Sequence, residues 1–359
     1  MREVRPGLDE LRAAGLLREL RTIDSASGPH VRLGGRDVLL LCSNDYLGLA
    51  GDPRVRAAAA EAAQRWGAGA GSSRLVSGAL ALHEALEAEL ADYLGTEACL
   101  LAGSGYLANL AVITALTEPG EVILSDALNH ASIVDACRLS RAETVVYEHL
   151  TVPEGPGTVV TDAVFSMDGD VAPLGALRKR DGLLIVDAAH HTGVVDGRVD
   201  ADVIVGTLSK ALGSYGAFIG CDAETRALLL NRARPIIYST ALPPAAVGAA
   251  RAALEILRCE PERVRRLHAN ARALREGLGA PASDMPIVPL IVGDPAEAVA
   301  LSERALERGV FAQAIRPPTV PDGTSRLRLV ARADHEPAEL VAAGAMLAEC
   351  LASTAPARP

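Results

Sequence analysis

Residues 183–210 read LLIVDAAHHTGVVDGRVDADVIVGTLSK, and two apolar runs in this stretch indicate the architecture of the chain. The runs, 183–187 and 202–206, have the length of buried strands, and each leads into polar residues. Similar runs recur through the middle of the chain and alternate with helical segments, which predicts an α/β fold with a mostly parallel sheet. The seven predicted strands are 98–102, 121–125, 143–147, 158–164, 183–187, 202–206 and 216–220, and the helices between them are 106–117, 131–140 and 173–180.

Outside this region the pattern changes at both ends. Leucines at helical spacing predict an amphipathic helix over residues 7–22, and Asp52-Pro53 predicts the start of a helix that reaches Trp66. We divide the chain into an N-terminal segment 1–50, a large α/β domain 51–240 and a smaller C-terminal α+β domain 241–359. In the last of these we expect helices 244–278, 295–308 and 335–352 and strands 287–292, 310–315 and 325–331.

The amino-acid composition argues against several classes of function. The 359 residues carry a net charge of −10, so the chain is a poor candidate for binding nucleic-acid phosphates. No apolar run reaches the ~18 residues of a membrane helix, and the first residues lack the apolar core of a signal peptide, so we expect a cytoplasmic protein. None of the six cysteines forms a C-x-x-C pair, which indicates neither a disulfide framework nor a metal site.

Lysine usage is the sharpest compositional signal. Among 35 basic residues, only Lys179 and Lys210 are lysines. Arginine cannot lose its proton at workable pH, whereas a lysine amine can, and it then attacks carbonyl groups. Lys179 lies between two arginines in a run typical of a solvated helix face. Lys210 follows a predicted strand, and we interpret it as a candidate catalytic amine, with a chance surface lysine as the alternative.

Polar residues gather at the predicted carboxyl ends of the strands, where open parallel sheets bind ligands. Asp187 ends one strand and Lys210 follows another. The segment 102–106, Ala-Gly-Ser-Gly-Tyr, joins a strand to a helix N-terminus, which is a natural seat for a phosphate group. An amine, an acid and a phosphate seat at one edge are what pyridoxal 5′-phosphate (PLP) requires. A nicotinamide cofactor is not indicated, because the glycine-rich run 67–71 follows a helix rather than the first strand of a βαβ unit.

The chain also contains seven longer motifs: SNDYLGL (43–49), GSSRLVSG (71–78), SGYLAN (104–109), HASIVDA (130–136), FSMDGD (165–170), TLSKA (207–211) and IRPPTVPDGTSRLRL (315–329). Together they resemble the α-oxoamine synthases, which are PLP enzymes of the aspartate-aminotransferase fold. The resemblance extends from Leu8 to about residue 350. It implies a type I fold, with a mostly parallel seven-stranded sheet, a smaller C-terminal α+β domain and an N-terminal helical segment.

The resemblance implies three catalytic residues. Lys210 would bind the cofactor aldehyde and later move a proton, Asp187 would pair with the ring nitrogen, and His130 would stack on the ring face. The remaining cofactor contacts would be Ser166 and His190 at the phenolic oxygen, Gly105, Tyr106 and Thr207 at the phosphate, and Thr240 at the phosphate of the neighbouring subunit. The substrate-binding residues would be Arg328 and Asn44 for the amino-acid carboxylate, and Arg18 and Thr319 for the acyl substrate.

The Arg-Pro-Pro-Thr sequence at 316–319 points to the biotin-pathway branch of the family. It implies the decarboxylative condensation of L-alanine with a pimeloyl thioester of coenzyme A or an acyl carrier protein, in a homodimer with shared sites. Alternatives with the same fold are a glycine C-acetyltransferase, an aminolevulinate synthase, or a synthase for another acyl chain. A different class is a non-catalytic relative that binds a partner or senses the cofactor, and the retained Lys210, Asp187 and His130 argue against it.

The chain departs from the family pattern in four places. Ala188 stands where the family has a second acid, and His191 stands where it has a glycine. A glycine permits a positive φ that histidine adopts only at a cost, so we expect an altered geometry near the phenolic oxygen. The connections 149–157 and 194–201 are shorter than in the family, and the first is at the lower limit for a crossover between parallel strands, which usually takes ~10–12 residues or more including its helix. We expect the shortening to affect stability or the entry of the acyl donor.

Overall fold

The computed structural model describes residues 5–353, with side chains from Gly7 onward. The chain divides into two compact units. The large unit comprises Leu49–Ser166 and Asp170–Pro261, and the other described residues form the small unit. Within residues 5–353, no helix is long and apolar enough to cross a membrane.

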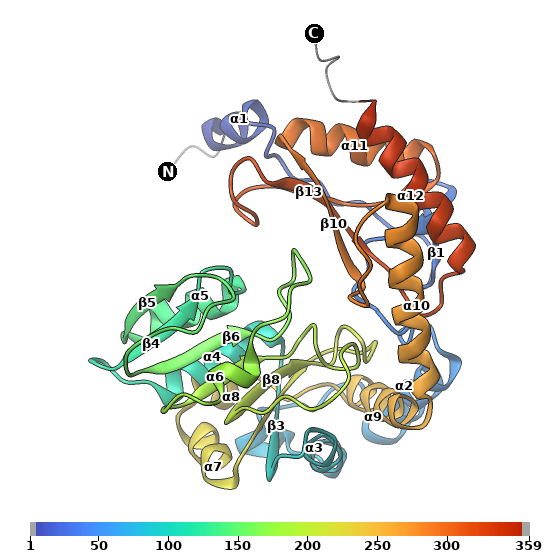
Figure 1. Ribbon diagram of the computed structural model, residues 1–359. Coiled ribbons are helices and arrows are strands. Elements are labelled where there is room, and N and C mark those ends of the chain that lie inside the picture. Colours follow the sequence, from blue (N-terminus) through green and yellow to red (C-terminus); the bar gives the residue numbers. More distant parts are fainter. Residues whose placement is uncertain (1–4, 354–359) are drawn as a thin grey trace. The chain divides into compact units, whose positions relative to one another are not determined.

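In the described part of the large unit, seven strands form one sheet in the order β3-β9-β8-β7-β6-β4-β5 (Figure 1). Strands β4 to β8 pair in parallel, whereas β9 is antiparallel to both of its neighbours. This confirms the predicted mostly parallel seven-stranded sheet. The strands are β3 (Ala98–Ala102), β4 (Val122–Asp126), β5 (Glu143–Tyr147), β6 (Thr158–Asp162), β7 (Leu184–Asp187), β8 (Val203–Thr207) and β9 (Ala217–Cys221).

Helices pack on this sheet through small apolar side chains. A buried cluster joins α4, α5, α7 and α8 to the strands, and it includes Val112, Ile133, Val160, Ile185 and Val205. Helix α2 begins where the sequence predicts, because the Asp52 carboxylate accepts the Arg54 N–H at 3.0 Å and Pro53 occupies the first turn. The helices are α2 (Pro53–Trp66), α3 (Ala81–Leu94), α4 (Gly105–Leu116), α5 (Ala131–Ser140), α6 (Leu174–Leu177), α7 (Ala223–Arg232), α8 (Arg234–Ile237) and α9 (Pro244–Cys259), with a π-helical turn at η1 (Arg74–Gly78).

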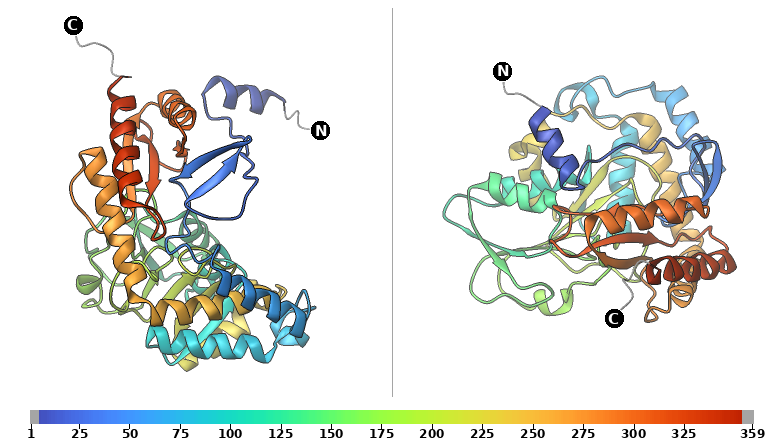
Figure 2. Two further views of the ribbon diagram at one scale, coloured as in Figure 1. Left: turned by 90° about the vertical axis from the view of Figure 1, so that its right-hand side faces the viewer. Right: turned by 90° about the horizontal axis from the view of Figure 1, so that it is seen from above.

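The small unit contains two three-stranded sheets in its described residues, β1-β2-β11 and β10-β13-β12. Helices α10, α11 and α12 share a buried apolar cluster with the second sheet, and Figure 2 shows α11 and α12 running alongside β10 and β13. The elements are α1 (Arg5–Ala13), β1 (His30–Leu33), β2 (Arg36–Leu40), α10 (Pro261–Leu278), β10 (Ile287–Gly293), α11 (Pro295–Glu307), β11 (Val310–Phe311), β12 (Ala314–Ile315), β13 (Ser325–Val330) and α12 (Pro337–Ala352).

Three sequence predictions of local structure are wrong. The predicted helix 7–22 ends at Ala13, because Gly15 adopts a left-handed φ of 66° and turns the chain. The predicted helix 244–278 is two helices, α9 and α10, because Pro261 cannot donate the N–H that would continue α9. The predicted strand 310–315 is split between the two sheets of the small unit, as β11 and β12. The sequence analysis also missed β1, η1, α7 and α8, and only residues 174–177 of the predicted helix 173–180 are helical.

The predicted domain boundary at residue 240 differs from the division in the structure. Helix α9 packs against α2 and α3, so residues 241–261 belong with the large unit. The described part of the N-terminal segment belongs to the same compact unit as the C-terminal elements, because β2 pairs in parallel with β11.

Candidate active site

The carboxyl ends of five strands meet at one edge of the large sheet. Strand β9 is antiparallel to both β3 and β8, so β3 points in the same direction as β8 and as the parallel strands β4, β6 and β7. The segments that follow these ends carry the residues singled out in the sequence. They are Ser104-Gly105 after β3, His130 after β4, Ser166 after β6, Asp187 and His190 at the end of β7, and Lys210 after β8.

Lys210 lies beside an imidazole at this edge. Its Nζ is 2.8 Å from Nε2 of His190, which is buried. Both residues had been assigned to the cofactor, and the structure brings them into contact. Lys179, by contrast, is exposed near the opposite ends of the strands, after the short helix α6. The two lysines of the chain therefore occupy very different environments.

The carboxylate of Asp187 is fixed on both oxygens. Its Oδ1 accepts the N–H of Ala189 at 2.8 Å, and its Oδ2 accepts an N–H of the Asn109 amide at 2.6 Å. Asp187 is buried at the end of β7. The sequence analysis assigned no role to Asn109, although a buried asparagine in the otherwise apolar helix α4 is a signal that could have found it.

A hydrogen-bond chain leads from Asp187 to the ring of His130. The second N–H of Asn109 donates to Ser132 Oγ at 2.9 Å, and Ser132 Oγ lies 2.7 Å from Nδ1 of His130. The backbone N–H of Ser132 also donates to that Nδ1, so Nδ1 is an acceptor and the ring is neutral. Desolvation lowers the pKa of His130, and the charge of Lys210 acts in the same direction against the opposing effect of Asp187. We therefore expect an uncharged imidazole with its proton on Nε2.

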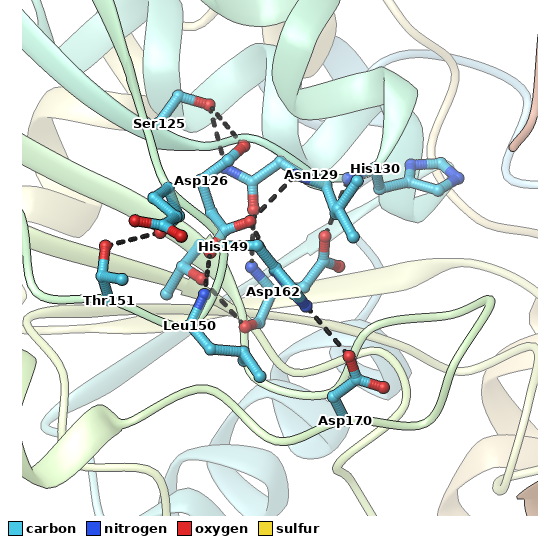
Figure 3. Close-up of polar contacts among 12 residues, drawn as sticks. Ser125, Asp126, Asn129, His130, His149, Leu150, Thr151, Asp162 and Asp170 are labelled. Atoms are coloured by element: carbon cyan, nitrogen blue, oxygen red, sulfur yellow. Dashed lines mark hydrogen bonds and ion pairs between the residues drawn. The ribbon is translucent and has the colours of Figure 1, made fainter. Parts of the chain in front are cut away.

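Asp162 is a second buried carboxyl group beside Asp187. The two residues are direct partners in the parallel pair β6–β7, and Asp162 Oδ2 accepts the backbone N–H of His130 at 2.7 Å (Figure 3). Burial, and next the charge of Asp187, raise the pKa of Asp162 well above its ordinary value. The sequence analysis did not consider it, because it placed Asp162 inside a strand predicted to run over residues 158–164.

The start of α4 is open to an anion. Ser104 caps the helix by accepting the N–H of Leu107 at 3.2 Å, while the N–H groups of Gly105 and Tyr106 have no partner within the helix. Nothing lies within 4 Å of where a side chain on Gly105 would start, so a ligand can approach the backbone there. The Tyr106 side chain points elsewhere and donates its hydroxyl to Asp135.

Thr207 and Thr240 differ in their surroundings. The Thr207 hydroxyl donates to the Gly216 carbonyl at 3.0 Å and lies 2.8 Å from Ser209 Oγ. The exposed hydroxyl of Ser209 is therefore a further candidate for a phosphate contact that the sequence analysis missed. Thr240 is exposed and pairs with Ser73 in an isolated bridge.

The predicted substrate residues lie in the small unit. Arg328 is buried and donates to Asn44 Oδ1 at 2.9 Å, so the structure brings together the two residues predicted to hold an amino-acid carboxylate. Arg18 donates to the Pro317 carbonyl at 3.1 Å, two residues before Thr319. Arg316 is a residue that the sequence analysis missed, and it ties this segment to the N-terminal stretch through the carbonyls of Gly15 and Leu17.

The departures from the family pattern have different outcomes. Among the described residues, Arg141 and Leu150 are the non-glycine residues with positive φ, so the strain expected at His191 does not occur. Burial lowers the pKa of His191 and favours its neutral form. Residues 148–157 cross from β5 to β6 without a helix.

Comparison with protein families gives the affiliation of the chain. The model of the family described as aminotransferase class I and II matches residues 36–345. The chain belongs to this family. This confirms the resemblance carried by the motifs, and it agrees with the observed sheet.

Similar proteins match nearly the whole chain. An 8-amino-7-oxononanoate synthase from Anaeromyxobacter dehalogenans (strain 2CP-1) is 49% identical over 382 residues, covering 98% of this chain and 96% of that protein. One from Geobacter sulfurreducens is 47% identical, covering 97% of each. The first alignment is longer than the chain itself, so that relative carries residues that this chain lacks.

Solved structures show the same fold. The serine palmitoyltransferase of Sphingomonas wittichii superposes with a TM-score of 0.90 at 30% identity and covers 98% of this chain and 100% of that chain. A lysine-to-alanine variant of a serine palmitoyltransferase from S. paucimobilis, solved with a bound PLP-myriocin aldimine, gives 0.89 at 29% identity, with 98% of each chain covered. An 8-amino-7-oxononanoate synthase from Francisella tularensis gives 0.77 at 24% identity, covering 88% of this chain and 98% of that chain.

Proposed function

We propose that this chain is a PLP-dependent acyltransferase that condenses L-alanine with a pimeloyl thioester. The products are 8-amino-7-oxononanoate, carbon dioxide and a free thiol, in the synthesis of biotin. The observation that carries the proposal is the 45–50% identity, over nearly the full length, to proteins with this named activity. The arrangement of Lys210, Asp187 and His130 supports the same chemistry.

The residues at the sheet edge fit PLP as a cofactor. Lys210 offers a primary amine for its aldehyde, and the open start of α4 at Gly105 suits its phosphate. Asp187 is a carboxylate with both oxygens fixed, which suits a protonated ring nitrogen. When bound, PLP supplies a carbonyl that amines attack and a ring that accepts the electrons left when a bond at Cα breaks.

The proton transfers are assigned to Lys210. Lys210 would hold the cofactor through its Nζ, and the same amine is assigned to take the α-proton of alanine and later to return a proton to Cα. His190 Nε2, at 2.8 Å, accepts a hydrogen bond from this amine and keeps it in place. Asp187 holds a negative charge in a buried position through its two hydrogen bonds, and His130 covers the cofactor as a neutral ring.

Arg328 and Asn44 are assigned to the carboxylate of alanine. The Cα–H bond must stand perpendicular to the cofactor ring to break, so the orientation of the carboxylate selects the bond that reacts. After alanine Cα attacks the thioester carbonyl and the thiol leaves, the condensed β-keto acid loses its carboxylate as carbon dioxide. Arg18 and Thr319 are assigned to the acyl chain.

Replacing Arg328 with lysine is expected to raise the KM for alanine roughly 10- to 100-fold, because a charge-assisted hydrogen bond contributes ~1.5–3 kcal/mol. The KM for the acyl thioester should change little. Arg36→Lys, on the exposed start of β2, is the matched control and should leave both values unchanged. Steady-state kinetics with each substrate varied separately test this, and an unchanged alanine KM in Arg328→Lys would contradict the assignment.

Product analysis tests the proposed function directly. Purified protein with PLP is incubated with alanine or glycine and with acyl thioesters of several chain lengths, each on coenzyme A and on an acyl carrier protein. We expect 8-amino-7-oxononanoate from alanine and the pimeloyl thioester, with carbon dioxide released in equal amount. Exclusive use of glycine, or turnover only with short acyl chains, would replace the proposal with another activity of the family.

We further propose a homodimer in which Thr240 of each subunit contacts the phosphate bound by the other. An exposed apolar surface beside Thr240 supports this, because Val76 and Tyr238 are 79% and 71% exposed and Ser73 pairs with Thr240. Apolar exposure of this extent is typical of an interaction surface.

A mixture of inactive variants tests the shared site. Thr240→Asp, which places a negative charge at the phosphate, and Lys210→Ala should each be nearly inactive alone. Co-expressed, they should recover up to about a quarter of wild-type activity, because half of randomly formed dimers are mixed and each mixed dimer has one intact site. A mixture that contains mixed dimers by mass spectrometry but recovers no activity would refute the shared site.

A further inference from the structure

His149 lies between two carboxylates that come from different parts of the large sheet. It lies two residues after the end of β5, and its Nδ1 is 2.8 Å from Oδ1 of Asp126, the last residue of β4. Its Nε2 is 2.9 Å from Oδ2 of Asp170, which ends the turn 165–170 after β6 (Figure 3). No role has been assigned to these three residues above, although Asp170 belongs to one of the family motifs.

The geometry favours a charged imidazole. A neutral ring has one N–H and can donate to one carboxylate, whereas both nitrogens of His149 lie within hydrogen-bond distance of one. The charged groups that act on the ring are Asp126 of β4 and Asp170 of the turn, and the third neighbour, Phe165, is uncharged. Burial by itself lowers the pKa of His149, but the hydrogen bonds with Asp170 and Asp126 outweigh it and raise the pKa above the ordinary value.

The carboxylate of Asp126 anchors this arrangement. Asp126 is buried, and its oxygens also accept the N–H of Leu128 at 2.9 Å and the N–H of Leu150 at 3.1 Å. Leu150 has a positive φ of 59°, which is costly for a leucine and shows how firmly the chain is held at this point. The segment that starts here is the connection 148–157, which lacks a helix of its own.

At its other nitrogen, His149 holds the turn that carries Ser166. The backbone carbonyl of Asp170 accepts the N–H of Phe165 at 2.9 Å, which closes the turn. The edge of one aromatic ring meets the face of the other, with the centroids of His149 and Phe165 4.3 Å apart. Ser166 is the next residue, so the positions of the Asp170 side chain and the Phe165 ring determine where Ser166 is presented.

We propose that His149 is a positioning residue that, as a cation, fixes the turn 165–170 and through it Ser166 at the cofactor. The inference rests on the proposed function only in the role given to Ser166. The contribution of the cation has a definite dependence on pH. It is complete below the ordinary imidazole pKa of 6.5 and is lost as the pH rises through the raised pKa of the folded protein.

Hydrogen exchange on the cofactor-free protein tests the turn without any reaction. In His149→Gln, which can donate to one carboxylate but cannot be protonated, the amides of Phe165 and Ala172 should lose protection roughly 10- to 100-fold at pH 6, the expected loss for a charge-assisted bond. In wild type, protection corrected for intrinsic exchange should fall between neutral and alkaline pH, whereas in the variant it should not vary. His30→Gln, at an exposed imidazole that pairs with Glu339, is the control and should leave this segment unchanged.

Two further measurements complete the test. PLP affinity, followed by cofactor absorbance, should weaken about 10-fold in His149→Gln and not in His30→Gln. Asp170→Asn removes one of the two carboxylate charges beside His149, so the pH at which protection is lost should shift to a lower value. If His149→Gln does not fold, this second variant still tests the proposal. Wild-type protection of the turn in His149→Gln, or an unshifted midpoint in Asp170→Asn, would overturn the proposal. The exchange measurements use no substrate, so their outcome does not depend on whether the protein catalyses the proposed reaction.

Discussion

We expect Lys210→Ala to lower turnover by at least about 10⁴-fold while the protein still folds, because the variant lacks the covalent nucleophile. Lys210 contacts His190 through its terminal amine, and its aliphatic stem is only half-buried. Loss of the stem therefore creates no large cavity, and the melting temperature should move by no more than a few degrees. Residual activity should not respond to pH as the wild type does, because the proton carrier is gone.

The second lysine is the matched control for the first. Lys179→Ala removes the same chemical group from an exposed position at the other edge of the sheet, and it should leave kcat and both KM values unchanged. Borohydride reduction of wild type, followed by peptide mapping, should place the cofactor on the peptide that contains Lys210. Equal activity of the two variants, or a label on the Lys179 peptide, would contradict the assigned role.

The fold could be predicted where local chemistry and packing agree. Helix α2 has a capping aspartate followed by proline, and its limits match the prediction. Six of the seven strands of the large sheet are short runs that are buried almost throughout, and in the edge strand β5 only Tyr147 is buried. The prediction failed at α1, where leucines at 16, 17 and 20 continue the helical spacing but Gly15 turns the chain. Leu20 is fully exposed, so spacing alone did not reveal which leucines are buried.

The candidate site could be predicted only where a residue has distinctive chemistry or belongs to a motif. Lys210 satisfies both conditions and Asp187 the first, and the contact of Arg328 with Asn44, 284 positions apart in sequence, follows from motif matching alone. Asn109, Asp162 and His149 act through other residues, and such roles depend on which strands are neighbours. The neighbours of β4, for example, are β5 and β6, which an ordered list of strands does not reveal.

Asp187→Asn is expected to lower kcat on the order of 10²- to 10⁴-fold, comparable with the loss of a positioned acid or base. The substitution keeps the size of the side chain and removes the charge that would keep the cofactor ring protonated. It also replaces an acceptor by a donor opposite Asn109, whose N–H now points at Asp187 Oδ2. Two donors cannot face each other, so we expect the Asn109 amide to flip.

That flip has a second consequence, at His130. The Oδ1 of Asn109 has no hydrogen-bond partner in the structure, so a flipped amide can accept from the new asparagine. The flipped amide presents its oxygen to Ser132. In the wild-type structure the Ser132 hydroxyl is directed at His130 Nδ1, and the amide oxygen would compete for its proton. In this way one substitution alters both the charge beneath the cofactor and the ring that covers it.

Control variants distinguish the effect of Asp187→Asn on kcat from a general loss of structure. Asp200→Asn, at an exposed carboxylate paired with Arg178, is the control and should keep full activity. Asn109→Ala removes the fixing amide but keeps the acid, so it should reduce kcat less than Asp187→Asn does. Adding Asn109→Ala to Asp187→Asn should cost little more, because contacting residues of one network do not act additively. Full activity of Asp187→Asn with normal cofactor content would show that the charge at this position is not required, and strictly additive losses in the double variant would show that Asn109 acts independently of Asp187.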